Sequence, residues 1–281
     1  TGSWNNPDNW SNLSHSGIAS SYYPGQVFAD DTVYIDGHTI TFNLDSISVD
    51  SVNVGGTNGN GAQGLLRLAN SPLVKKLRVG SLSLGIDNGK IEPESTIANR
   101  YDTLFIERRL INNSTGGVDF SGGSNYSTTL KFLNGVDSYI SGNGVWTGLS
   151  KVVLDKTDGL NDSLFVQSNT FAAATNIAPQ MELTINKGVL VNQSTGILDL
   201  NNGSLISTMG AFSGLKSEAG TIRSKTQLTS NSSTTYVCNG GNIQIGDGLN
   251  EHFLYKTGTL IDVLNGSLFV EIGRASCRER V

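Results

Sequence analysis

The chain has 281 residues, of which 15% are charged and 34 are glycine, and its net charge is −5 at pH 7. An acidic surface is a poor partner for phosphate or anionic lipid, so no nucleic-acid partner is expected. No apolar run approaches the roughly 20 residues that a membrane-spanning helix requires, so no membrane span is expected either.

The first 31 residues differ from the rest and predict a capping segment over 1–31. Trp4 and Trp10 lie in the segment Gly-Ser-Trp-Asn-Asn-Pro-Asp-Asn-Trp, which is followed by a polar loop. The ends of repeat proteins expose apolar side chains and unpaired backbone groups, so their terminal units are atypical. Two indoles laid over such an end would cover a large apolar area. We therefore predict that Trp4 and Trp10 form a buried structural cap.

From residue 32 to residue 271, short runs alternate apolar and polar residues and are separated by Asn-Gly and Asp-Gly turns. This pattern predicts short strands with one apolar face. The residues expected to point into one continuous core are Val33/Ile35, Ile40/Phe42, Val52/Val54, Leu77/Val79, Leu82/Leu84, Leu104/Ile106, Leu130/Phe132, Val152/Leu154, Leu164/Val166, Leu183/Ile185, Val189/Val191, Leu198/Leu200, Ile243/Ile245 and Leu268/Val270. The only helix-like stretch runs from Thr170 to Ala178.

The spacing of these strands favours a solenoid. Apolar positions recur after 21 or 22 residues, from Leu130 to Val152, from Leu183 to Leu205 and from Ile222 to Ile243. A recurrence near twenty indicates one coil per repeat, each coil burying its inner face on its neighbours. The predicted fold class is all-β, a right-handed parallel β-solenoid (β-helix) over 32–271. A tandem β-sandwich is the alternative, because Asn-Gly pairs also signal hairpins.

The last ten residues, 272–281, break the composition of the chain with three arginines and one cysteine in the string IGRASCRERV. This string resembles a translated sequencing adapter, so we predict a non-native tail over 272–281. Without it Cys238 is the single cysteine, and no disulfide is expected. We also expect the β pattern to be truncated, so that the remaining repeats of the same longer chain are partners of the last coil.

Few residues suggest a catalytic or metal-binding site. Asp155, Asp158 and Asp162 lie in one loop and are weak calcium candidates, because their spacing misses the alternate-position ligands of a calcium loop. Turn formation by Asp and Asn is the competing interpretation. The three histidines lack a second ligand at zinc-site spacing, and no nucleophile elbow or phosphate loop occurs. No catalytic residue and no cofactor other than Ca²⁺ is therefore predicted.

Two further groups are candidates for glycan contact. Aromatic rings can stack on sugars, and Trp146, Tyr22 and Tyr23 lie in loop-like contexts. The cluster Glu107-Arg108-Arg109 is a candidate for binding an acidic glycan. A solvated strand edge, where charges oppose aggregation, is the competing interpretation of that cluster.

Two segments carry a family resemblance. The first contains, in this order, Trp4, Trp10, Pro24, Asp30-Asp31, Val33, Ile35 and Thr39-Ile40-Thr41-Phe42. The second runs from Ser141 to Lys156 and includes Trp146. Both are similar to segments of large exported bacterial surface proteins built on β-helix repeats, many of which carry a C-terminal sorting domain. The resemblance implies outer-membrane export, an extracellular or cell-surface location and an adhesin-like role, and it brings no catalytic residues.

The expected function is a non-catalytic structural or adhesive segment of a bacterial surface protein, with polysaccharide, cell-surface glycan or other cells as candidate partners. The alternative is a fragment of a carbohydrate-active β-helix enzyme, either a polysaccharide lyase or a glycoside hydrolase. Such an enzyme would show clustered carboxylates or basic residues along one face of the solenoid.

Overall fold

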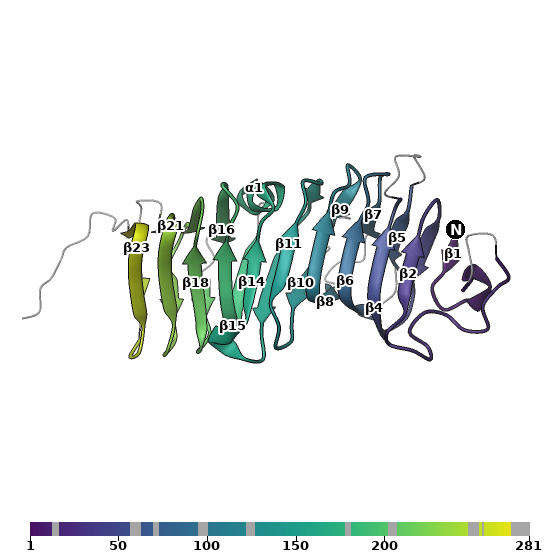
Figure 1. Ribbon diagram of the computed structural model, residues 1–281, viewed down its shortest axis with the longest axis horizontal. Coiled ribbons are helices and arrows are strands. Elements are labelled where there is room, and N and C mark those ends of the chain that lie inside the picture. The colour runs from purple at the N-terminus through teal and green to yellow at the C-terminus, as the bar shows by residue number, and fades with distance from the viewer. Residues whose placement is uncertain are drawn as a thin grey trace, which may run out of the picture. The chain divides into compact units, whose positions relative to one another are not determined.

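The computed structural model describes residues 1–12, 17–56, 63–69, 73–94, 101–121, 127–177, 181–201, 207–246, 253–254 and 256–270. The chain is nearly all β, with 55% strand and 6% helix, and it forms a β-solenoid of about seven turns built from stacked parallel coils (Figure 1). The predicted β-solenoid is thus confirmed over the tandem sandwich. The chain forms two compact units, Thr1–Lys151 and Val152–Val281.

In the first unit, each coil contributes strands to three parallel series. One series is a six-stranded sheet that consists of β1 (Gly2–Ser3), β3 (Thr39–Phe42), β5 (Leu65–Leu68), β7 (Lys90–Pro93), β9 (Gly117–Asp119) and β12 (Trp146–Thr147). The long strands β4 (Ser46–Val54), β6 (Lys76–Leu84) and β8 (Tyr101–Asn112) serve the other two series. The first half of β8 pairs with β10 (Ser127–Phe132) and its second half with β11 (Ser138–Ser141), while β2 (Thr32–Ile35) pairs with the second half of β4.

The core of this unit consists of columns of apolar side chains, one from each coil. Val52, Leu82 and Leu110 occupy paired positions on adjacent strands and are at most 1% exposed. Burying a side chain of this size contributes about 1.5–3 kcal/mol. The alternation read from the sequence therefore identified the inner face of β4 and β6 correctly.

The second unit repeats this plan with three further series. Its strands are β13 (Lys151–Asp155), β14 (Ser163–Val166), β15 (Glu182–Asn192), β16 (Ile197–Asn201), β17 (Ser207–Met209), β18 (Ser213–Ser217), β19 (Thr221–Ser224), β20 (Leu228–Ser230), β21 (Thr235–Ile245), β22 (Phe253–Leu254) and β23 (Leu260–Val270). The prediction that Val189 and Val191 point inward is wrong. Leu190, which lies between them, is the inner residue, and it pairs with Leu164 and Leu215. All three of these leucines are fully buried.

The coils are longer and less regular than the sequence spacing predicted. Ile222 pairs with Ile243, as expected, but Leu190 pairs with Leu215 about 25 residues later. In the first unit Val52 pairs with Leu82, which lies about 30 residues further along the chain. The extra residues lie in the connections between strands, where no apolar alternation marks their number.

Helix α1 (Asn169–Ile177) falls within one residue of the predicted helical stretch and packs on β16. Two of its side chains accept hydrogen bonds from backbone N–H groups that a neighbouring strand would otherwise satisfy. Thr175 Oγ1 accepts from the N–H of Asp199 at 2.9 Å, and Asn169 Oδ1 accepts from the N–H of Thr195 at 2.9 Å. The helix therefore covers the edge strand of the sheet β16–β19–β21–β23.

Among the residues that the structure describes, the helical elements besides α1 are the 3₁₀ turns η1 (Pro7–Asn9) and η2 (Gly159–Asn161). Within the described ranges, no helix is long and apolar enough to cross a bilayer.

A corner motif that the sequence analysis missed occurs once in each unit. The segment Asn-Asn-Ser-Thr-Gly begins at Asn112 and the segment Asn-Gln-Ser-Thr-Gly begins at Asn192. Both asparagines are fully buried, and each accepts a hydrogen bond from the backbone N–H of the serine two residues later. The motif turns the chain between two strands of the same coil, from β8 towards β9 and from β15 towards β16.

The last described strand, β23, presents its apolar side chains to solvent. Ile261 and Val263 continue the inner columns of Tyr236 and Cys238, yet they are 44% and 47% exposed. β23 therefore carries an exposed apolar face. The predicted tail, residues 272–281 with Cys277, lies outside the described residues.

Candidate functional site

The N-terminal residues place an aromatic cluster on the first coil. Trp4 is fully buried, and its ring packs edge-on against Phe42 at 5.4 Å and Trp10 at 5.2 Å between centroids. Its indole N–H donates to the carbonyl of Pro24 at 3.1 Å, and that of Trp10 donates to the carbonyl of Trp4 at 2.8 Å. Trp4 is thus buried as predicted, whereas Trp10 is only half-buried.

The segment 1–31 is also joined to the solenoid through its backbone. β1 pairs with β3, and the N–H of Trp4 donates to the carbonyl of Thr41 at 2.8 Å. At the other end of the segment, the carbonyl of Asp31 accepts from the N–H of Asp50 at 3.0 Å. These hydrogen bonds and the aromatic cluster hold the capping segment against the coil that follows it.

The candidates for glycan contact lie in different environments. Trp146 is only 4% exposed, because its ring continues the inner column that runs through Ile91 and Val118. A ring buried in the core cannot stack on a sugar, so the prediction for Trp146 is wrong. Tyr22 and Tyr23 are half-buried in the capping segment, where Tyr22 packs edge-on against Phe28 at 5.9 Å between centroids.

The three aspartates proposed for calcium lie around η2, and two of them hold its turn together. Asp162 is 6% exposed, and its Oδ2 accepts from the N–H of Asp158 at 2.9 Å. Asp158 Oδ2 accepts from the side-chain amide of Asn161 at 3.4 Å. Among the residues whose structure is described, no group of three or more His, Cys, Asp or Glu side chains is placed to hold a metal ion. The geometry around Asp162 is that of a side chain closing a turn.

Charged side chains on the first unit are paired with partners from other coils. Glu107 pairs with Arg78, and Arg108 pairs with Asp50 at 2.5 Å. Two members of the Glu107-Arg108-Arg109 cluster therefore have their charge balanced within the protein. This arrangement resembles the solvated, charged strand region that was the competing interpretation.

A second ladder of charges crosses the six-stranded sheet. Glu92 pairs with Arg67 and Lys90, each at 2.7 Å, and Lys90 also pairs with Asp119 at 3.1 Å. Partial burial acts to raise the pKa of Asp119, but hydrogen bonds from Ser121, Lys90 and Thr147 outweigh it and lower that pKa to about 2. The pKa of Glu92 is lowered too, because bonds from Lys90 and Arg67 outweigh its desolvation. Both carboxyls are therefore ionised at neutral pH.

The second unit contains a buried ion pair beneath α1. Asp199 is fully buried and accepts two bonds from Arg223, at 2.7 Å from Nε and 2.9 Å from Nη2. Lys225 Nζ lies 3.2 Å from the same carboxylate, and Asn176 of α1 accepts from Arg223 at 2.8 Å. Such a cluster joins two strands and the helix, and two cations share its one buried carboxylate.

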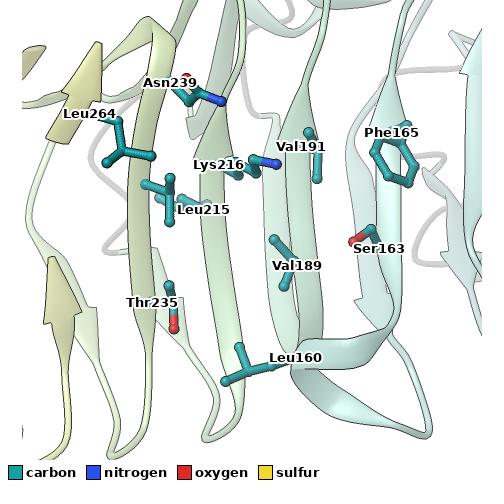
Figure 2. Close-up of a pocket in the computed structure, with 11 residues that line it drawn as sticks. Leu160, Ser163, Phe165, Val189, Val191, Leu215, Lys216, Thr235, Asn239 and Leu264 are labelled. Carbon is teal, nitrogen blue, oxygen red and sulfur yellow. The ribbon is translucent and has the colours of Figure 1, made fainter. Parts of the chain in front are cut away.

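The feature that sequence reasoning missed is a hollow on the outer face of β14, β15, β18 and β21 (Figure 2). It has a volume of about 420 Å³, and we call it the Gly214 hollow because Gly214 pairs with Val189 and Thr235, two of the residues that line it. Its lining consists of Leu160, Ser163, Phe165, Val189, Val191, Leu215, Lys216, Thr235, Val237, Asn239 and Leu264. The apolar runs Leu164–Val166 and Val189–Val191 carry the signal, because a strand with only one buried face would alternate with polar residues.

Coil-on-coil stacking places this chain among the β-solenoid proteins. Comparison of the chain with protein-family models, with curated proteins and with solved structures found no match. Its function is therefore argued from its own residues.

Proposed function

We propose that this chain is a non-catalytic structural and adhesive segment of an exported bacterial surface protein, whose outer faces contact glycan or other cells. The observation that carries the proposal is the pairing of charged side chains along the coils. Glu92, Asp119 and Glu218 each bind a lysine from the solenoid, and the pKa of each is lowered.

The lowered pKa values of these three carboxyls favour a structural role over that of a glycosidase. A glycosidase requires a carboxylic acid that stays protonated near neutral pH, and therefore one whose pKa is raised. A carboxylate held by a lysine has the opposite property, and the pair Lys90–Asp119 also links the adjacent strands β7 and β9. In the proposed function these charges stabilise the stacked coils and keep their surface solvated.

Two measurements test the proposal. The purified chain is incubated with neutral and acidic polysaccharides, and the release of reducing ends and of unsaturated uronic products is followed. No release above a heat-unfolded sample is expected, whereas turnover that falls in Glu92→Gln or Asp119→Asn would establish an enzyme.

The second measurement compares bacterial cells that display the chain on their surface with cells that display the core variant Leu190→Asp. Cells with the native chain should be retained on glycan-coated surfaces or on other cells. Cells with Leu190→Asp should not be retained, because a charge in the inner column disrupts the coil that presents the outer faces. Equal retention of both cell types would contradict the adhesive role.

A further inference from the structure

The outer face around the Gly214 hollow differs from the matching face of the first unit. The second half of β8 leads into the corner motif at Asn112, and the second half of β15 leads into the corner motif at Asn192. The outward positions of these two half-strands therefore correspond. In the first unit the corresponding outward ladders are Thr32–Ser51–Ser81–Arg109 and Tyr34–Asn53–Ser83–Ile111. In the second unit they are Ser163–Val189–Gly214–Thr235 and Phe165–Val191–Lys216–Val237. The outward ladders are thus largely polar in the first unit and largely apolar in the second, where Val191 is only 1% exposed and Phe165, Val189 and Val237 are half-buried.

Gly214 lies between two residues that line the hollow. A Cβ atom at this position would lie 3.1 Å from the carbonyl oxygen of Thr235 and 3.3 Å from a methyl carbon of Val189, so a larger side chain would displace these two walls. The hollow that they help to line has a volume of about 420 Å³. Pockets for small ligands span roughly 300–1,000 Å³. The hollow therefore has the size of a small-ligand site.

Its lining combines apolar and hydrogen-bonding groups. Figure 2 shows Val189 and Val191 between Phe165 on one side and Thr235 on the other, with Lys216 and Asn239 at the same face. A sugar ring offers C–H groups on its face and hydroxyls around its edge. An aromatic ring, aliphatic walls and a few amide or hydroxyl groups complement both parts of such a ring.

Charge selects among sugars. Lys216 Nζ lies 2.5 Å from a carboxylate oxygen of Glu218, and hydrogen bonds from Lys216 and Gln193 lower the pKa of that carboxyl. The single cation at the hollow is therefore balanced by a neighbouring anion. A negatively charged uronic acid would therefore gain little electrostatic attraction from Lys216. A neutral sugar loses no binding energy through the pairing of Lys216 with Glu218.

An extended peptide is a poorer match. β15 pairs with β14 and β18, and β18 pairs in turn with β21, so the strands at the hollow have neighbours on both sides. A peptide that binds by strand addition needs an unpaired edge. We infer that the Gly214 hollow binds a neutral oligosaccharide through the face of one sugar ring. This inference rests on the proposed function, because it specifies the glycan contact of that function.

The test is a titration of the purified chain with cellohexaose, xylohexaose, mannohexaose and, as the acidic probe, hexagalacturonate. Binding is followed by calorimetry and by the methyl NMR signals of Val189 and Val237. The variants are Gly214→Val, whose side chain crowds Val189 and Thr235 in the wall of the hollow, and Phe165→Ser, which removes the ring. The control Ser81→Val adds a similar side chain to the matching ladder of the first unit. Retained circular dichroism and Tm show that each variant is folded.

At least one neutral hexasaccharide should bind and shift both methyl signals. Its affinity should fall about tenfold or more in Gly214→Val and Phe165→Ser, and stay unchanged in Ser81→Val. The inference is overturned if no neutral probe binds, if the acidic probe binds better, or if folded variants keep full affinity. A concentration-dependent dimer that Gly214→Val abolishes would identify a second copy as the occupant and also overturn it. Failure of this titration leaves the non-catalytic and cell-retention results standing, so the two proposals are judged separately.

Discussion

Asn112 and Asn192 make equivalent hydrogen bonds at equivalent corners of two coils. Asn112 Nδ2 donates to the carbonyl of Val145 at 2.8 Å, and Asn192 Nδ2 donates to the carbonyl of Thr221 at 3.2 Å. In each case the carbonyl belongs to the following coil, while the asparagine oxygen accepts from a serine of its own corner. One amide therefore closes a turn and joins two coils at once.

Replacement of either corner asparagine by alanine should destabilise the protein. Asn112→Ala or Asn192→Ala leaves the buried N–H of the corner serine without its partner, which costs about 1–3 kcal/mol, and also removes the bond to the next coil. The measurement is the free energy of unfolding in urea. Asn113→Ala, at the adjacent exposed position, is the matched control and should change it by less than about 0.5 kcal/mol. Equal effects of Asn112→Ala and Asn113→Ala would refute the role of the corner amide.

The aromatic cap yields a second prediction. Trp4→Ala should cost about 3–5 kcal/mol, because it removes a fully buried ring that packs on Phe42. Trp10→Ala should cost less, since Trp10 is half-buried. Tyr34→Ala, at a side chain that is 67% exposed, serves as the control. Thermal unfolding measures all three, and a Trp4→Ala variant with native Tm would show that the cap carries no stability.

The Asp119 carboxyl predicts a pH dependence of stability. Its pKa is about 2 in the folded chain and about 3.9 in an unfolded one, so its ionised form favours folding. This contribution, about 1–2 kcal/mol after allowance for partial exposure, is complete above pH 4 and is lost as the pH falls through 2. The free-energy difference between the wild type and Asp119→Asn should therefore be largest above pH 4 and shrink towards pH 2. A difference that does not vary with pH would contradict this linkage.

The buried cluster under α1 predicts a larger effect. Asp199→Asn leaves Arg223 and Lys225 without their anion in a covered site, which should cost about 3–5 kcal/mol. The matched control is Glu218→Gln, because Glu218 pairs with Lys216 at a more exposed position and should cost less than about 1 kcal/mol. Urea unfolding of both variants makes the comparison. Similar losses in the two would show that burial of Asp199 adds nothing.

Short-range patterns predicted most of the fold. The alternation at Val52/Val54 and Leu82/Leu84 identified inward residues, because each strand there has one polar face. It failed at Val189–Val191, where three apolar residues in a row leave the inward position undefined. Trp146 follows a glycine-rich turn and so has a loop-like sequence context, but its pairing with Val118 places it in the core.

The candidate site could not be predicted because it depends on register between coils. Val189 and Thr235 line the same hollow only because both pair with Gly214 on the strand between them. These residues are separated by connections whose lengths differ from coil to coil. The pairing of Lys90 with Asp119 is unpredictable for the same reason, since the two side chains meet only once the register of β7 and β9 is known.

Helix α1 shows that a coil of the solenoid can contain a helix without any change in the pairing of the strands next to it. Its side chains satisfy the edge of β16, while β14 and β15, on either side of it in sequence, remain in register with each other. The connection between those two strands is therefore a natural grafting position. A small helical module inserted there would need to supply acceptors in place of Asn169, Thr175 and Asn176, and an apolar face in place of the buried Phe171 and Ala172.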